Sequence, residues 1–195
     1  LIGGDTTKGP LSAHITVIGD VPKGMAVSRQ GLKPGDDLWL FGPDLGGARA
    51  YLDVLQNTQA DHALWAERYW RPEPQFDFGI ALRDVASAMI DISDGLCQDL
   101  MHLVERAKKP ASIKLQSKMI PLCADLVDRL GTQTALEYAL TGGDDYCLLV
   151  SIPSTARVPQ GGHRIGLVVQ PENESILLDG QPLPESWQLG WDHSR

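Results

Sequence analysis

The sequence predicts an α/β fold of the α+β kind, in which helices flank a mixed β-sheet. Short apolar runs bounded by glycine and proline, such as residues 38–41 and 165–169, indicate buried strands. Between such runs lie segments with apolar residues at helical spacing, among them Leu96, Leu100 and Leu103. The two kinds of segment do not alternate regularly, so the pattern favours a mixed sheet over repeated βαβ units.

Local residue patterns place the elements in order along the chain. Residues 13–21 are rich in β-branched residues and stop at Pro22, which predicts a first strand. The proline-rich segment 71–74 ends a helix, and Ser93-Asp94-Gly95 opens another. The further strands are expected over 38–41, 89–92, 111–115, 146–152, 165–169 and 176–178, and the helices over 46–55, 61–70, 79–88, from 96 onwards, 121–130 and 133–140.

Composition restricts the classes of function. The chain has 195 residues, 43% of them hydrophobic and 22% charged, which suits one globular domain or one domain plus a piece of another. No run approaches the roughly 20 apolar residues that a membrane-spanning helix needs. Lys and Arg number 17 against 25 Asp and Glu, a formal net charge of −8. This acidic balance argues against general nucleic-acid binding, and it means that a phosphate ligand would be met through metal ions.

The three cysteines, Cys97, Cys123 and Cys147, are widely spaced. An odd number without a C-x-x-C pair argues against a disulfide framework and against a structural zinc site. We therefore expect them to be small core residues of a protein in the reducing cytoplasm.

Three glycine-containing loops carry aspartates: the 3–7 loop (Gly3-Gly4-Asp5-Thr6-Thr7), the 91–95 loop (Asp91-Ile92-Ser93-Asp94-Gly95) and the 141–145 loop (Thr141-Gly142-Gly143-Asp144-Asp145). Glycine lets the backbone approach a ligand closely, and carboxylates and hydroxyls are the hard oxygen ligands that Mg²⁺ takes. Together the loops predict a magnesium–phosphate site. No Walker A motif, G-x-S-x-G elbow or H-E-x-x-H motif occurs.

Each loop also has a purely structural interpretation. Asp94 could cap the helix that follows it, and Asp5 could stabilise a turn through its own side chain. The 141–145 loop could be a tight turn before a strand. Asp91 is harder to explain structurally, because a carboxylate at the end of a buried run needs a partner.

Five motifs, in order over essentially the whole chain, resemble the thiamine-monophosphate kinase family, which belongs to the aminoimidazole-ribonucleotide-synthetase-like superfamily. They are Gly3-Gly4-Asp5-Thr6-Thr7-x-Gly9-Pro10, Arg29-x-Gly31-x-x-Pro34-Gly35-Asp36, Asp91-Ile92-Ser93-Asp94-Gly95-Leu96, Leu140-Thr141-Gly142-Gly143-Asp144-Asp145-Tyr146 and Gly190-Trp191-Asp192-His193. The resemblance implies an α/β subunit of two domains that forms a cytoplasmic homodimer. It also implies a kinase that transfers the γ-phosphoryl group of ATP directly to thiamine phosphate, with several Mg²⁺ ions and without a phosphoenzyme.

Site residues follow from the same resemblance. Those matched to ATP binding are Gly4, Asp5, Arg29 and Ser93; those matched to magnesium are Asp5, Asp91 and Asp94; those matched to the thiamine substrate are Asp144 and Trp191. No residue is matched to a covalent nucleophile. Arg29 could equally make a surface ion pair and Trp191 could be ordinary packing, although a guanidinium suits phosphate and an aromatic ring suits a cationic thiazolium.

The chain departs from the family pattern in two respects. Asp144 stands where the family usually has glutamate, so its carboxylate is one methylene shorter. The family also has roughly a hundred further residues before the 3–7 loop, the size of a small domain. We therefore expect residues 1–24 to be the end of an N-terminal ATP- and Mg-binding domain whose remainder is missing, and residues 25–195 to be the C-terminal domain. Such a fragment is expected to fold but to be nearly inactive.

Two other interpretations stay open. The chain could belong to another member of the superfamily with a different phosphoryl acceptor, such as a selenophosphate synthetase or a hydrogenase-maturation protein. It could also be a domain that binds nucleotide and catalyses nothing.

Overall fold

The computed structural model describes residues 9, 14–57, 63–187 and 190. Its centre is a seven-stranded mixed sheet in the order β2-β4-β1-β5-β3-β6-β7. Neighbouring strands run antiparallel except β3 and β6, which are parallel. The strands are β1 (Asp36–Phe41), β2 (Ala88–Asp91), β3 (Ser112–Leu115), β4 (Leu148–Pro153), β5 (Gly162–Val169), β6 (Ile176–Leu178) and β7 (Gln181–Pro182).

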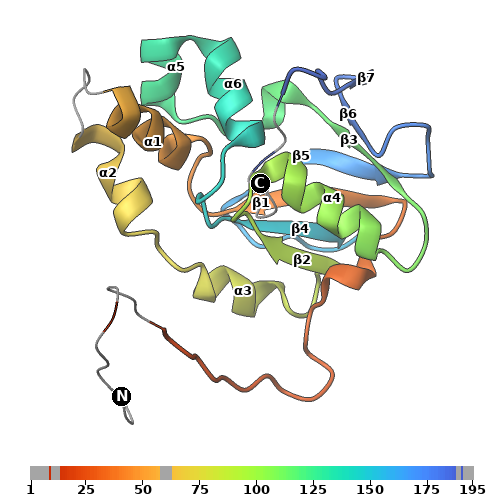
Figure 1. Cartoon of the computed structure of the whole chain (residues 1–195). Helices are drawn as coiled ribbons and strands as arrows, with labels where there is room; N and C mark the ends of the chain where they lie inside the picture. The colour runs from red at the N-terminus through yellow and green to blue at the C-terminus, as the bar shows by residue number, and fades with distance from the viewer. Residues whose placement is uncertain (1–8, 10–13, 58–62, 188–189, 191–195) are drawn as a thin grey trace.

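Helices cover both faces of the sheet, which confirms the predicted fold class (Figure 1). The α-helices are α1 (Gly47–Asn57), α2 (Ala63–Trp70), α3 (Phe76–Leu82), α4 (Leu96–Arg106), α5 (Ala124–Leu130) and α6 (Thr132–Thr141), and the 3₁₀ helices are η1 (Arg29–Gly31) and η2 (Ser117–Met119). Among the described residues, no helix is both long and apolar enough to cross a membrane.

Alternating side chains along the strands build two cores. On one face of β1, Leu38 and Leu40 pack in the main core with residues of α4 and α6. On the other face, Phe41 packs in a smaller core with Leu82 of α3. A third cluster joins α1, α2, α5 and α6 beside the sheet. The period-2 alternation of strand side chains therefore assigns α4 and α3 to opposite faces.

Three sequence-based boundaries were wrong. Residues 14–21 form no strand, because a strand needs a partner for its backbone groups and none of the described strands pairs with this segment. The helix expected over 79–88 is α3, which ends at Leu82, and Ala88 already belongs to β2 opposite Ser151. The strand expected from residue 146 starts at Leu148, because Tyr146 has a φ of +51°, outside the β region.

The three cysteines are buried free thiols, as expected for core residues. Burial raises the pKa of Cys97 to about 12 and also raises that of Cys147. These thiols therefore stay protonated at neutral pH and make poor nucleophiles.

Candidate magnesium–phosphate site

The 91–95 and 141–145 loops lie side by side because the sheet pairs the strands that they adjoin. β2 and β4 are antiparallel neighbours, with Asp91 opposite Leu148, so the end of one strand lies beside the start of the other. Backbone hydrogen bonds continue past the strands: Asp144 N–H donates to the Ser93 carbonyl over 2.9 Å, and Tyr146 N–H donates to the Ile92 carbonyl over 2.8 Å. The two loops thus form one unit, as a shared ligand site requires.

Glycine is needed where these loops touch. A Cβ on Gly143 would lie 2.4 Å from the Ser93 carbonyl oxygen, closer than any real side chain approaches. A Cβ on Gly95 would lie 2.9 Å from the Thr141 carbonyl oxygen, and Gly95 also has a φ of +125°, which side chains rarely adopt. The loops can approach this closely only because these positions lack side chains.

Asp144 and Tyr146 both have positive φ without being glycine, at +63° and +51°. The Tyr146 hydroxyl donates to Oδ1 of Asp144 over 3.0 Å. Burial raises the pKa of Tyr146 to about 12, and its hydrogen bond to Asp144 and the charges of Asp144 and Asp91 add to the rise. Tyr146 therefore stays a hydrogen-bond donor at neutral pH and directs the Asp144 carboxylate.

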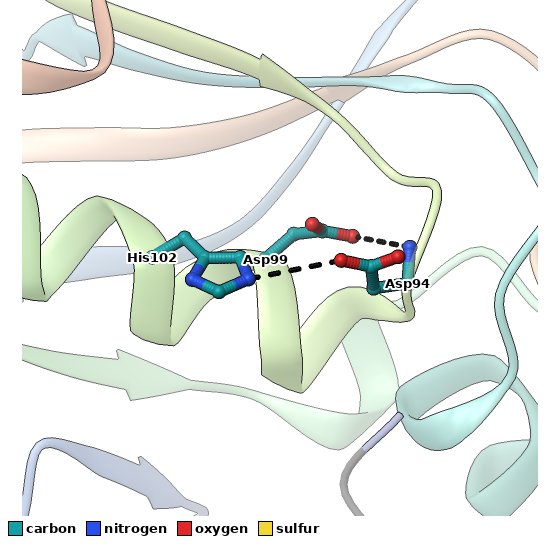
Figure 2. A group of neighbouring side chains, drawn as sticks. All are labelled: Asp94, Asp99 and His102. Atoms are coloured by element: carbon teal, nitrogen blue, oxygen red, sulfur yellow. Dashed lines mark hydrogen bonds and ion pairs between the residues drawn. The ribbon is translucent and has the colours of Figure 1, made fainter. Parts of the chain in front are cut away.

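Asp94, Asp99 and His102 gather at the start of α4 (Figure 2). One ligand atom from each of the three side chains lies within 4.8 Å of the others. Nε2 of His102 is 3.7 Å from Oδ2 of Asp94. Burial raises the pKa of Asp99 to about 6; N–H bonds from Asp94 and Gly95 oppose the rise, and the negative charges of Asp94 and Asp91 reinforce it. Negative charge thus accumulates at this helix end.

The helix-cap interpretation of Asp94 does not hold in this structure. The N-cap residue of α4 is Gly95, which has no side chain to accept a capping hydrogen bond. It is Asp99 that accepts hydrogen bonds from the backbone N–H groups of Asp94 and Gly95. The carboxylate of Asp94, a quarter exposed, faces His102 at the loop surface.

A second buried carboxylate, Asp145, fixes the 141–145 loop to α1. Both of its oxygens accept the N–H of Gly46, at 3.2 and 3.0 Å, across 99 residues of sequence. Burial raises the pKa of Asp145 to about 7, against the lowering effects of the N–H groups of Gly46 and Ala48 and of the Arg68 charge. Asp145 therefore anchors the loop, whereas the neighbouring Asp144 is partly exposed.

The structure brings four of the predicted site residues together: Asp91, Ser93, Asp94 and Asp144. Asp91 is exposed and Asp94 is partly exposed. Carboxylate oxygens are the donors that Mg²⁺ prefers, so these residues fit magnesium by donor type. Among the described residues, the group of possible metal ligands within 4.8 Å of one another is Asp94, Asp99 and His102, which does not include Asp91.

Arg29 is not part of this group. It begins η1, where the carbonyl of Gln30 accepts from Lys108 N–H just beyond the end of α4. Asp94 precedes the other end of this 11-residue helix, which is about 16 Å long at 1.5 Å per residue. Within the described chain, Arg29 and the acidic loops therefore lie at opposite ends of α4.

Gly4, Asp5 and Trp191 lie outside the described residues. Gly190, the residue before Trp191, is described and lies against the 91–95 loop. A Cβ on it would come within 2.5 Å of the Asp94 carbonyl oxygen, and its φ is +100°. The C-terminal motif thus begins in contact with the acidic loops.

The sequence analysis did not predict the structural roles of four residues: Asp99, Asp145, Tyr146 and His102. One signal for Asp99 was available, because it lies on the same helical face as the buried residues Leu96, Leu100 and Leu103. A carboxylate on a buried face requires hydrogen-bond partners. Asp145 was counted with its loop as part of the magnesium–phosphate site, and nothing local indicated that it is a buried anchor, because its partner Gly46 is distant in sequence.

No protein-family model matches the chain. Curated relatives do. A thiamine-monophosphate kinase of Escherichia coli K12 is 38% identical over 210 residues, and one of Salmonella typhimurium is 36% identical over 208 residues. Each match covers 99% of this chain. The chain is a relative of the thiamine-monophosphate kinases.

Solved structures of thiamine-monophosphate kinases share its fold. That from Stenotrophomonas maltophilia aligns with a TM-score of 0.73 and 29% identity, over 84% of this chain and 56% of that one. AaThiL complexed with AMPPCP and TMP aligns with a TM-score of 0.70 and 30% identity, over 83% and 53%. The E. coli hydrogenase maturation protein HypE, at 17% identity over 88% and 56%, shares only the fold, with a TM-score of 0.66.

The chain spans 63% of the length of the thiamine-monophosphate kinases from E. coli and Salmonella typhimurium. More than a third of their sequence thus has no counterpart in this chain. The sites in the two acidic loops belong to the shared part.

Proposed function

We propose that the chain is part of a kinase that transfers the γ-phosphoryl group of ATP to thiamine phosphate, giving thiamine diphosphate and ADP. The joining of the 91–95 and 141–145 loops carries the proposal, because it places the residues matched to nucleotide and metal beside the residue matched to the thiamine substrate. The sequence similarity to thiamine-monophosphate kinases supports the choice of acceptor.

Charge explains the arrangement. ATP and thiamine phosphate are both anions, and the joined loops carry the acidic residues Asp91, Asp94 and Asp144. Magnesium held by Asp91 and Asp94 would supply the positive charge that phosphate oxygens need in this acidic site. The Ser93 hydroxyl would contact ATP, and Asp144, held by the Tyr146 hydroxyl, would face the cationic thiazolium ring.

In this proposal the chain's own residues position two substrates and form no covalent bond to either. The backbone hydrogen bonds between the two loops would hold Ser93, matched to ATP, at a fixed distance from Asp144, matched to the thiamine substrate. Direct in-line transfer requires such fixed positions. Trp191, which follows Gly190 at the edge of the 91–95 loop, would pack against the substrate. A cytoplasmic homodimer and the division into residues 1–24 and 25–195 also stay predictions.

The activity is proposed for the longer protein. If the part of the relatives that has no counterpart in this chain supplies further magnesium ligands, as the family resemblance implies, the present chain alone should turn over very slowly. A second candidate function follows from the same 63% coverage: this segment could bind Mg-ATP without catalysing transfer. Calorimetric binding of Mg-ATP without thiamine diphosphate formation by the extended protein would favour that candidate.

The test is thiamine diphosphate formation from thiamine phosphate and Mg-ATP, by this chain and by the protein extended to the length of its relatives. Only the extended protein should form product quickly. Asp91→Asn and Asp94→Asn should each lower its kcat/KM by about 100-fold or more, on the scale of losing a transition-state electrostatic contact. Glu174→Gln, an exposed carboxylate before β6, should leave the rate unchanged.

Two results would contradict the proposal. If the extended protein forms no thiamine diphosphate but uses another phosphoryl acceptor, the acceptor is wrong and a different superfamily activity is indicated. If Asp91→Asn and Asp94→Asn are as active as Glu174→Gln, the acidic loops are not the site.

A further inference from the structure

The carboxylate of Asp99 is 1% exposed and lies beneath the 91–95 loop. Its Oδ2 accepts two backbone hydrogen bonds over 3.1 Å each, one from the N–H of Asp94 (Figure 2) and one from the N–H of Gly95. Hydrogen bonds to an ionised acceptor are stronger than those to a neutral one. The backbone at the start of α4 is thus held from below by one buried side chain.

Two glycine contacts also restrict the path of the 91–95 loop. Gly95 has a φ of +125°, and its Cα lies against the Thr141 carbonyl of the neighbouring loop. Gly190 packs against the Asp94 carbonyl on another side. The Asp94 peptide is therefore contacted by Gly190 at its carbonyl and by Asp99, which supplies the hydrogen-bond acceptor for its N–H.

We propose that Asp99 is a positioning residue that fixes the backbone from Ser93 to Gly95, so that the side chains of Ser93 and Asp94 are directed at a magnesium–nucleotide ligand. The ligand assigned to the 91–95 loop rests on the proposed function. The two hydrogen bonds from the loop to Asp99 do not depend on that function.

The position of Asp99 carries an electrostatic cost that its two hydrogen bonds must offset. Asp99 is buried near two other carboxylates, Asp94 and Asp91, and burying a charge among like charges destabilises a protein. A serine or asparagine N-cap is not available at position 95, because Gly95 has a φ of +125° and an added Cβ would lie 2.9 Å from the Thr141 carbonyl oxygen. An acceptor four residues into the helix reaches the N–H groups of Asp94 and Gly95, while Oδ2 of Asp94 lies 3.7 Å from Nε2 of His102.

The experiment compares Asp99→Ala, Asp99→Asn and the matched control Asp36→Ala. Asp36 is also a buried carboxylate, 2% exposed, and accepts the Ser151 hydroxyl over 2.7 Å. It lies opposite Pro153, at the end of β4 remote from the acidic loops. Both alanine variants should lower the melting temperature, so only site-specific readouts separate them.

Amide hydrogen exchange of the Asp94 and Gly95 N–H groups is measured first, in the present chain. Asp99→Ala should speed this exchange by about 10- to 100-fold, because each N–H loses a partner in a buried place. Asp99→Asn keeps an oxygen of the same shape and should retain most of the protection. Asp36→Ala should leave exchange at these two amides within about threefold of wild type, the scale of a distant surface effect.

Magnesium dependence is measured second, in the extended protein. Asp99→Ala should raise the Mg²⁺ concentration for half-maximal turnover by about 10-fold or more, with the KM for thiamine phosphate changed much less. Asp99→Asn should rescue most of this loss. If the extended wild type makes no thiamine diphosphate, the proposed function fails, and calorimetry of the chain with magnesium chloride alone replaces turnover as the second readout.

Asp99→Ala could behave like Asp36→Ala in both exchange and magnesium dependence. That result would overturn the positioning role and leave Asp99 as a stability residue. Faster exchange with an unchanged magnesium requirement would also overturn the positioning role, because Asp99 would then order the loop without affecting magnesium binding.

Discussion

The buried carboxylate of Asp145 should make the stability of this chain fall as pH rises from 4 to 7. Its pKa is raised from an ordinary value of 3.8 to about 7, first of all by burial. A pKa raised by folding means that the folded state keeps its proton over a range where the unfolded chain has lost it. Stability is therefore fully present below pH 3.8 and is lost progressively as pH rises towards 7.

The size of the effect follows from linkage. With these two pKa values, raising the pH from 5 to 8 removes about 2 to 3 kcal/mol of unfolding free energy through this one group, at 1.36 kcal/mol per unit of pKa. Asp145→Asn cannot ionise, so it should abolish this share of the pH dependence. The variant also loses one acceptor for the N–H groups at the start of α1, a cost that does not depend on pH.

Urea unfolding of wild type and Asp145→Asn at pH 5, 6, 7 and 8 measures the prediction, and the readout is the difference between their pH slopes. Asp179→Asn is the matched control. Its hydrogen bonds from Ser117 lower the pKa of Asp179, so its titration lies below this window and its slope should match wild type. Parallel curves for wild type and Asp145→Asn would refute the reasoning, because they would show that burial does not favour the protonated form.

Two further predictions concern the contact between the acidic loops. Gly143→Ala should destabilise the chain by about 1–3 kcal/mol, the usual cost of overpacking, because the added Cβ would lie 2.4 Å from the Ser93 carbonyl oxygen. The control Gly19→Ala, at a position with open space around it, should change the unfolding free energy by less than about 0.5 kcal/mol in the same thermal melts. Equal effects of the two substitutions would contradict the geometry. In the extended protein, Tyr146→Phe should raise the KM for thiamine phosphate about fivefold, the value of one hydrogen bond to Asp144, without changing the KM for ATP; a parallel change in both constants in initial-rate assays would exclude a role specific to the thiamine substrate.

The amino-acid sequence determined the local features of this protein. Apolar runs and helical spacing placed most elements within a few residues, and the aspartate- and glycine-containing loops were visible as strings. The ordered motifs indicated thiamine-monophosphate kinase, which the relatives support. These features are readable because they depend on residues near one another in the chain.

The boundary errors share a physical cause. Residues 14–21 have the composition of a strand, but a strand exists only when another strand accepts its hydrogen bonds. Ala88 looked like the end of a small-residue helix, and pairing with Ser151 of β4 drew it into the sheet. In both cases pairing with a strand distant in sequence, absent for 14–21 and present for Ala88, decided the structure over the local preference.

The tertiary structure alone decided how the site is assembled. Pairing of β2 with β4 brought the 91–95 and 141–145 loops together, whereas Arg29 was left at the far end of α4. Asp99 and Asp145 gained their roles through burial, because a buried carboxyl group is stable only where N–H groups meet it. Sequence patterns report which residues a loop contains, but burial and contact between distant segments exist only after the chain has folded.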